Sequence, residues 1–490
     1  MTRRILALGL TALVSACASG PDFKQPAAPT DTAYASAGAA PTIPSVHGAG
    51  VDQHFAPGAK IAAEWWSLYR SSALDEVLRQ AIAGNRNLAA ATASLRQAHE
   101  AVLVAASGYY PHVDFNASAL RERNNFKAVG ITVFPPKEFN VYTLGPTVSY
   151  SVDLFGLTGR QVEQAAALEE AQNYELQAAY LTLTGSAVTE AVTIASLRAQ
   201  IKAIEDILTD DQNNLRLVRD QLNAGTATDL DVETATSQLA SDRTQLAPLR
   251  QQLSVAQHAL TVLVGKTPAG WAPPDFDLDN LTLPGEVPVS LPSALVRQRP
   301  DILVAEAQLH AASASVGIAT AELYPSINIS ASIAQQFLKP DTIFDPASNI
   351  WNVGSSLAAP LFHGGALQAQ KRGAEAAFQS SLASYEQTVL ASFGQVADLL
   401  DGLAHDAELL AAEQTASDAA AAALRLTRTS YSLGSATLLQ VLDTQRSFEQ
   451  ARLGLVRAQA QRYLDTAQLF VALGGGWWER PAAQAAATSP

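Results

Sequence analysis

One stretch of the chain occurs twice, and this duplication constrains the fold more than any other feature. The copies begin at Asn87 and Asp301, 214 positions apart, and need no gap. Each carries apolar residues spaced alternately three and four apart, which in the second copy are Ile302, Ala305, Leu309, Ala312, Val316, Ala319 and Leu323. This spacing predicts a helix with a seam of coiled-coil period. The chain is therefore predicted to consist of two similar halves, an internal two-fold repeat.

Each repeated helix leads directly into a predicted strand. Tyr-Pro closes both helices, and the period then changes to two, as in Val113, Phe115, Ala117 and Ala119. Strands are predicted at about 111–121, 141–154, 326–337 and 350–361. Strands of about ten residues cross a bilayer when tilted. A soluble sandwich would show the same alternation, so the period alone does not distinguish the two.

The rest of each half is predicted to be a long helical hairpin. Helices are expected at about 160–222 and 366–433, broken at Gly225 and Gly434, with returning helices to about Val264 and Leu473. Pro248 is expected to kink the first returning helix. Each long helix matches in length a returning helix plus the next repeated helix. The sequence therefore predicts a tall helical cylinder capped by strands.

The N-terminus has the features of a secretory signal. Arg3 and Arg4 precede a short apolar run that ends in a segment resembling the bacterial lipobox, with Cys17 as the lipidated residue. A buried cysteine in an ordinary signal peptide is the alternative. The predicted organisation is a signal peptide, a lipidated tether, a first repeat, a second repeat and a flexible tail, at 1–16, 17–60, 61–292, 293–475 and 476–490.

Composition excludes several classes of function. A net charge of −14 argues against a nucleic-acid partner, and the eight histidines lack metal-ligand spacing. The chain shows no nucleophile elbow, so we expect no enzyme activity, no metal and no cofactor. After the signal no run of 18 apolar residues appears, so strands must make any membrane crossing. Four strands cannot close a barrel, so the chain must oligomerise; eight, twelve or sixteen strands would satisfy this argument.

Several motifs resemble one known family. They are the run from Arg297 to Leu309, the two Tyr-Pro joints, Asp153-Leu-Phe-Gly, Tyr431-Ser-Leu-Gly with Val441-Leu-Asp443, and the closing Ala-Leu-Gly-Gly-Gly-Trp. Together they resemble the TolC-like outer-membrane efflux proteins over about residues 60 to 478. The lipobox is similar to that of their lipoprotein branch, the NodT type.

The resemblance implies an α+β membrane protein and a homotrimer. Its twelve-strand transmembrane β-barrel, four strands per chain, would continue into a periplasmic α-helical barrel. It would be the lipid-anchored exit duct of a tripartite efflux pump in the outer membrane of a Gram-negative bacterium. Its partners would be a periplasmic adaptor protein and an inner-membrane transporter of the resistance-nodulation-division class. A duct for type I protein secretion and a non-channel coiled-coil scaffold are the alternatives.

The resemblance also implies a site at the hairpin tips. Asp231 and Asp443 correspond to acidic residues that ring the closed aperture, and Tyr431 to a tyrosine that latches the tips. Some relatives carry an arginine at the position of Ala436, so Arg428 is considered as a substitute. Surface or capping aspartates are the alternative for the acidic pair. The tip residues expected to contact the adaptor are Gly225, Thr226, Gly434 and Ser435.

Overall fold

The computed structural model describes residues 19–34, 42–43, 52–124 and 137–479. The chain forms two compact units, and each is built from three separate segments. The first unit comprises Met1–Gln25, Leu95–Gln172 and Ala305–Tyr385, and the second comprises Pro26–Ser94, Asn173–Val304 and Glu386–Pro490.

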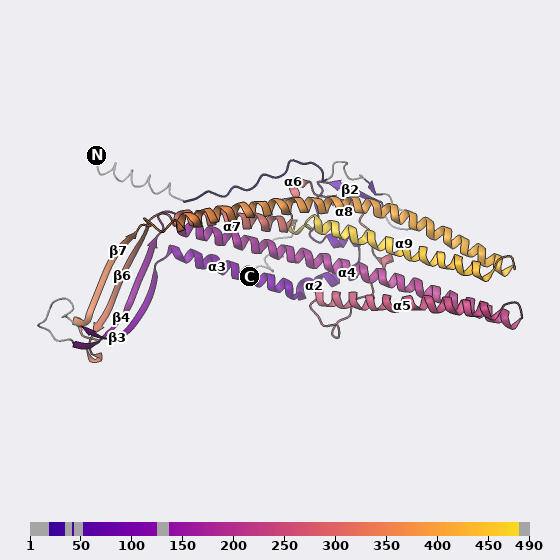
Figure 1. Cartoon of the computed structure of the whole chain (residues 1–490), viewed down its shortest axis with the longest axis horizontal. Coiled ribbons are helices and arrows are strands. Elements are labelled where there is room, and N and C mark those ends of the chain that lie inside the picture. Colours follow the sequence, from indigo (N-terminus) through magenta and orange to yellow (C-terminus); the bar gives the residue numbers. More distant parts are fainter. Residues whose placement is uncertain (1–18, 35–41, 44–51, 125–136, 480–490) are drawn as a thin grey trace. The chain divides into compact units, whose positions relative to one another are not determined.

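A four-stranded antiparallel sheet lies in the first unit (Figure 1). Its order is β3 (His112–Asn124), β4 (Lys137–Val152), β6 (Ser326–Phe337) and β7 (Asn349–Ala358). The four predicted strands are confirmed, although β4 begins before residue 141. The last strand was predicted to reach 361 and instead ends at Ala358, because Pro360 has no N–H to extend the ladder.

The register places apolar side chains of all four strands on one face of this sheet. Val113 pairs with Val148, Val148 with Ala331, and Ala331 with Val353, so the four form one row. Many side chains on this face are exposed in the single chain. They include Val113, Phe115, Ile333, Trp351, Val353 and Leu357. The sheet therefore presents a continuous apolar surface that the described residues leave uncovered.

The repeated helices are α3 (Arg86–Ala106) and α7 (Pro300–Ala321). Both stop before the Tyr-Pro joint, because the residue before a proline disfavours the helical conformation. Among the described residues, α7 is long and apolar enough to cross a membrane by length and composition, with a mean hydropathy of 1.3 over its best window. More than half of that window is buried, as in a helix packed inside a protein.

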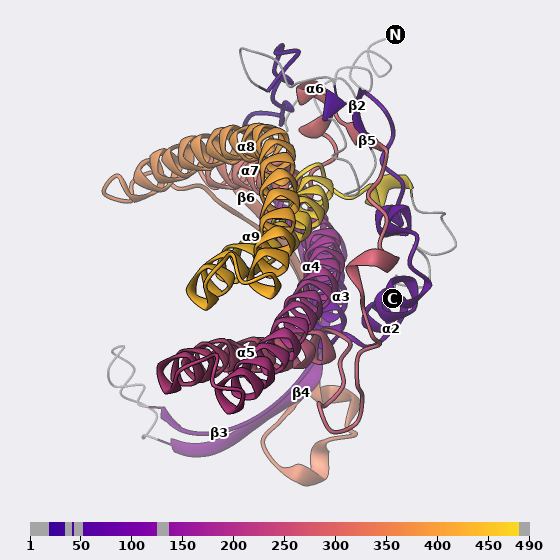
Figure 2. The same ribbon diagram turned by 90° about the vertical axis from the view of Figure 1, so that its right-hand side faces the viewer.

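Two long hairpins complete the repeats (Figures 1 and 2). Helix α4 (Leu157–Asn223) returns as α5 (Asp229–Leu263), and α8 (Ala366–Ser432) returns as α9 (Leu438–Ala472). Both long helices have 67 residues, which confirms their predicted equivalence. Helix α5 stays helical through Pro248.

The aromatic core of the second unit surrounds Trp65, which is fully buried and stacks on Phe470 at 5.3 Å between ring centroids. The apolar spacing from Glu64 to about Gly84 predicts one amphipathic helix, and this prediction is wrong. The segment divides into a 3₁₀ helix, Trp65–Tyr69, and α2 (Ser72–Gly84), because Arg70 adopts a left-handed φ of 53°. The Ser71 side chain then accepts a hydrogen bond from the N–H of Leu74 and begins α2.

The N-terminal segment lies on each unit in turn. In the first unit, Arg160 donates from Nε to the carbonyl of Ser19 at 3.0 Å and from Nη2 to Asp22 at 2.9 Å. Gly20 has a φ of 90°, and a Cβ there would lie 2.4 Å from the Cα of Gly317, so only glycine fits. In the second unit, Tyr34 Oη donates to the carbonyl of Ser290 at 2.6 Å.

Residues 17–60, predicted to form a tether, include two short strands. Strand β1 (Thr42–Ile43) pairs with β2 (Gln53–Pro57), which pairs in parallel with β5 (Glu286–Val289). These strands have two to five residues, too few for a period of two to stand out.

Candidate functional site at the helix tips

The two hairpin tips have the same backbone geometry, 209 residues apart in the sequence (Figure 2). Gly225 and Gly434 both adopt a left-handed conformation, with φ of 74° and 75°. The next N–H in each tip bonds back to the helix, Thr226 to the carbonyl of Gln221 and Ser435 to that of Ser430, at 2.8 and 2.9 Å. This is the hydrogen bonding of a glycine-terminated helix, so a side chain at either glycine would strain the turn.

Each returning helix begins with a capping box. In α5, Thr228 accepts from the N–H of Asp231 at 3.3 Å, and Asp231 Oδ2 accepts from the Thr228 N–H at 2.8 Å. In α9, Thr437 and Gln440 make the same reciprocal pair. The repeat partner of Asp231 is therefore Gln440 and not Asp443.

The two candidate aperture aspartates thus differ in their surroundings. Hydrogen bonds from the Thr228 hydroxyl and backbone N–H lower the pKa of Asp231, so it stays ionised well below neutral pH. Asp443 lies exposed in the second turn of α9, and its carbonyl accepts from Ser447 at 3.0 Å. Asp231 therefore has a capping role, which is the alternative to an aperture role, whereas Asp443 does not cap its helix.

Tyr431 joins the two hairpins in the last turn of α8. Its hydroxyl donates to Gln221 Oε1 on α4 at 2.6 Å, and burial raises its pKa. Its ring packs against a small apolar cluster of Val218, Leu438 and Leu442. The residue predicted to latch the tips therefore makes a contact between hairpins within this chain.

Arg428 makes a second link one turn before Tyr431. Its Nη2 donates to Asp210 Oδ2 on α4 at 2.9 Å and to Gln445 Oε1 on α9 at 3.4 Å. Both partners of the ion pair are partly exposed. Arg428 on α8 therefore contacts both α4 and α9.

The tips carry residues that stay exposed in the described part of the chain. Gly225, Thr226, Gly434 and Ser435 are all exposed. Leu230 and Leu439, also 209 positions apart, are 74% and 71% exposed and lie in the first turns of α5 and α9. Sequence analysis missed this leucine pair, which the repeat alignment could have identified. Cys17, the predicted lipidation site, lies outside the described residues.

Comparison with known proteins gives a match in both halves. The profile of the family described as "Outer membrane efflux protein" matches residues 77–266 and 291–475, one segment in each repeat. The pyoverdine export outer membrane protein OpmQ of Pseudomonas aeruginosa is 32% identical over 421 residues, covering 84% of this chain and 87% of that protein. The cation efflux system protein CusC of Escherichia coli is 26% identical and covers 97% of this chain and 99% of that protein.

Solved structures show the same architecture. The outer-membrane channel OprN has 28% identity and a TM-score of 0.82, with 94% of this chain and 100% of that chain covered. The Campylobacter jejuni CmeC outer membrane channel has 18% identity and a TM-score of 0.87 over 96% of this chain and 98% of that chain, a likeness in fold.

Two repeats of long helices with four strands per chain define the TolC-like outer-membrane channel fold. This class comprises export channels and not enzymes. The chain belongs to the outer membrane efflux protein family. It is the outer-membrane channel component of an efflux pump, in the outer membrane of a Gram-negative bacterium, with a large periplasmic helical part.

Proposed function

We propose that three copies of this chain close a twelve-strand barrel around one exit duct. The open apolar sheet carries this proposal. Lipid cannot satisfy the backbone groups at free sheet edges, so β3 and β7 need strands of other copies beside them. The row from Val113 to Val353 supplies the lipid-facing surface that such a barrel requires.

The duct is proposed to be gated at its periplasmic end by the helix tips. Tyr431 and Arg428 join the hairpins within a chain, and three copies each of Asp231 and Asp443 would place negative charge around the axis. Crowded carboxylates attract cations and repel one another, so a closed aperture of this kind would conduct little and favour cations.

The exposed helix tips support the proposal of a periplasmic adaptor as a partner. A periplasmic adaptor would contact Gly225, Thr226, Gly434 and Ser435, with Leu230 and Leu439 as apolar anchors. The adaptor would join the trimer to an inner-membrane transporter of the resistance-nodulation-division class. Lipidation of Cys17 would anchor the N-terminal tether in the outer membrane. The hydrogen bonds that Arg160 donates to Ser19 and Asp22 would keep the start of that tether packed against the first unit.

The transported compounds are proposed to be small toxic molecules or drugs. The relatives are named for different cargoes, including pyoverdine, solvents and cations. A shared channel with such varied cargoes indicates that the inner-membrane partner selects what is exported. The alternative duct for secreted polypeptides would share this channel and differ in that partner.

Single-channel conductance in planar bilayers tests the proposal. We expect the purified native trimer to give a small, cation-selective current, and Asp231→Ala with Asp443→Ala to give a larger and less selective one. A control, Asp220→Ala with Glu233→Ala, removes two exposed carboxylates from the first hairpin and should behave as the native protein. A native current that the aspartate changes leave unaltered would move the gate elsewhere, and no current from any variant would favour the scaffold.

A further inference from the structure

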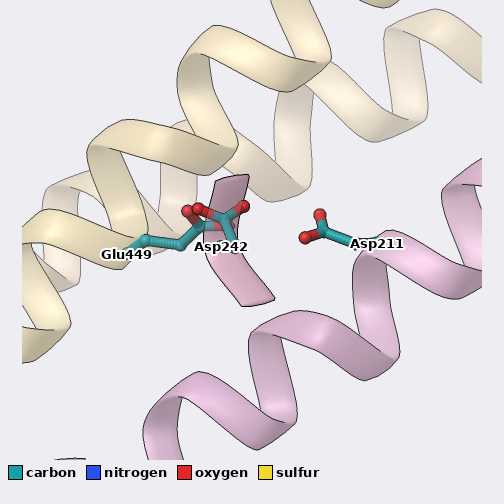
Figure 3. Close-up of side chains that lie close together, drawn as sticks. All are labelled: Asp211, Asp242 and Glu449. Carbon is teal, nitrogen blue, oxygen red and sulfur yellow. The ribbon is translucent and has the colours of Figure 1, made fainter. Parts of the chain in front are cut away.

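A buried carboxylate cluster lies where three helices meet in the second unit (Figure 3). Asp211 comes from α4, Asp242 from α5 and Glu449 from α9. Their side chains are nearly inaccessible, with residue exposures of 2%, 3% and 4%. One oxygen of each lies within 4.8 Å of the other two, and Figure 3 shows the Asp211 carboxylate directed toward the other pair.

Neutral amides donate hydrogen bonds to this cluster, and Asp211 and Asp242 lie close enough to share a proton. Gln445 donates from Nε2 to Asp211 Oδ1 and to Glu449 Oε1, the latter at 3.1 Å. Asp242 accepts from Gln238 and Gln245 at 2.7 and 3.1 Å. Within the described part of the chain, neither lysine nor arginine forms an ion pair with any of the three carboxylates.

One oxygen of the cluster faces no N–H donor within the described residues. This atom is Asp211 Oδ2, which is buried. Buried polar atoms are nearly always bonded, and a buried carboxylate oxygen without a donor is costly. Because the side chain that carries it is directed into the cluster, this oxygen requires either a bound proton or a cation at that place.

The geometry matches one class of ligand. Calcium binds oxygen ligands at about 2.3 to 2.6 Å, so oxygens on opposite sides of one ion are separated by about 4.6 to 5.2 Å. An all-oxygen set without histidine or cysteine favours a hard cation, and magnesium more often keeps water than collects three carboxylates. We propose that Asp211, Asp242 and Glu449 form a binding site for a divalent cation of the calcium type.

The site would act on the contact between the hairpins. A bound ion would tie α4 and α5 to α9, and Gln445, which bonds two of the three carboxylates, also accepts from Asn214 on α4 at 2.6 Å and from Arg428 on α8. Cation occupancy would therefore stabilise the packing of the hairpins next to the latch. This inference goes beyond the export function and holds whether or not the tips form the gate.

Protons would compete with the cation for the same oxygens. Burial, together with the neighbouring carboxylates, raises the pKa of Asp211 to about 8 and that of Glu449 to about 7. The charged groups around them are Asp210 on α4, Arg428 on α8 and Arg446 on α9. Cation affinity should therefore rise with pH until the cluster is deprotonated.

Calorimetric titration with CaCl₂ tests the site in the purified full-length protein. The protein is first stripped of metal with EDTA and dialysed at about pH 8, because deprotonated carboxylates favour cation binding. We expect one ion per chain at this site. Asp242→Asn and Glu449→Gln each remove a ligand charge with little change of shape, and each should weaken binding at least about tenfold, since even residues behind a ligand contribute that much.

Two controls locate the bound ion. Glu233→Gln removes an exposed charge from α5, and Asp220→Asn removes an exposed charge from α4; both should retain the titration of the native protein. Thermal unfolding provides a second measurement, because CaCl₂ should raise the unfolding midpoint of the native protein and not that of the cluster variants. Calcium binding that is unchanged in both cluster variants would overturn the proposal. A native protein that binds no calcium and is stabilised only by lowering the pH would also overturn it.

Discussion

The hydroxyl of Tyr431 on α8 donates a 2.6 Å hydrogen bond to Gln221 Oε1 on α4, in the last turn of both helices. The ring of Tyr431 also packs on the apolar cluster of Val218, Leu438 and Leu442. One side chain thus combines a polar and an apolar contact between the two hairpins. Parting the tips would break both contacts.

We expect Tyr431→Phe to increase the open fraction of the channel about fivefold, because one such hydrogen bond contributes about 1 kcal/mol and the phenyl ring keeps the apolar contact. Open probability in planar bilayers measures this. Tyr110→Phe, at an exposed tyrosine of the helix-to-strand joint, serves as the control and should have no effect. An unchanged open fraction in the Tyr431 variant would show that this bond does not hold the tips.

The Arg428–Asp210 ion pair should stabilise the contact between the hairpins less than the Tyr431 hydrogen bond does, and its contribution should depend on salt concentration. Both side chains are partly exposed, so we expect a coupling free energy of up to about 1 kcal/mol in a double-mutant cycle of Arg428→Gln and Asp210→Asn. The coupling should shrink in high salt because ions screen exposed charges. Unfolding free energies of the four proteins measure it, and a coupling that is absent at low salt would exclude a role for this pair.

The long helices and the four strands could be predicted because their periods extend over many residues. Both periods occur twice, and the glycines of the tips lie at equivalent positions. The short strands β1, β2 and β5 could not be predicted, because backbone pairing between distant segments leaves no period in five residues or fewer. The hydrogen bond from Arg160 to the Ser19 carbonyl likewise joins residues far apart in the sequence, so it could not be predicted either.

Two features of the site are present in the sequence. Thr228 with Asp231 three residues later has the pattern of a capping box. Asp242 lies on the buried stripe of α5 with Ala235, Leu246 and Leu249, at helical spacing. A carboxylate in an apolar stripe signals a buried polar cluster, although the partners on α4 and α9 emerge only from the packing.

Replacement of the two aperture aspartates should affect stability differently. Asp231→Ala removes half of the capping box, so we expect it to lower the free energy of unfolding by about 1 kcal/mol, whereas Asp443→Ala should leave it nearly unchanged. Because the pKa of Asp231 is lowered on folding, its contribution is complete at neutral pH and is lost as the pH falls through the folded value. Chemical unfolding of both variants at neutral and acidic pH checks this, and equal losses would contradict a capping role specific to Asp231.

In the absence of divalent cations, the protein should lose stability as the pH rises from about 6 to about 8. The pKa values of Asp211 and Glu449 are raised to about 8 and about 7, mainly by burial, whereas unfolded carboxyls titrate near 4. Between those values the folded chain binds more protons than the unfolded chain, so the free energy of unfolding falls with increasing pH.

Unfolding midpoints in EDTA across this range measure the effect. Asp211→Asn should flatten the slope, because an amide at this position carries no charge at any pH, whereas Glu233→Gln on the exposed face of α5 should retain it. A midpoint that rises with pH in the native protein, or a slope that Asp211→Asn leaves intact, would show that this cluster is not the group that titrates.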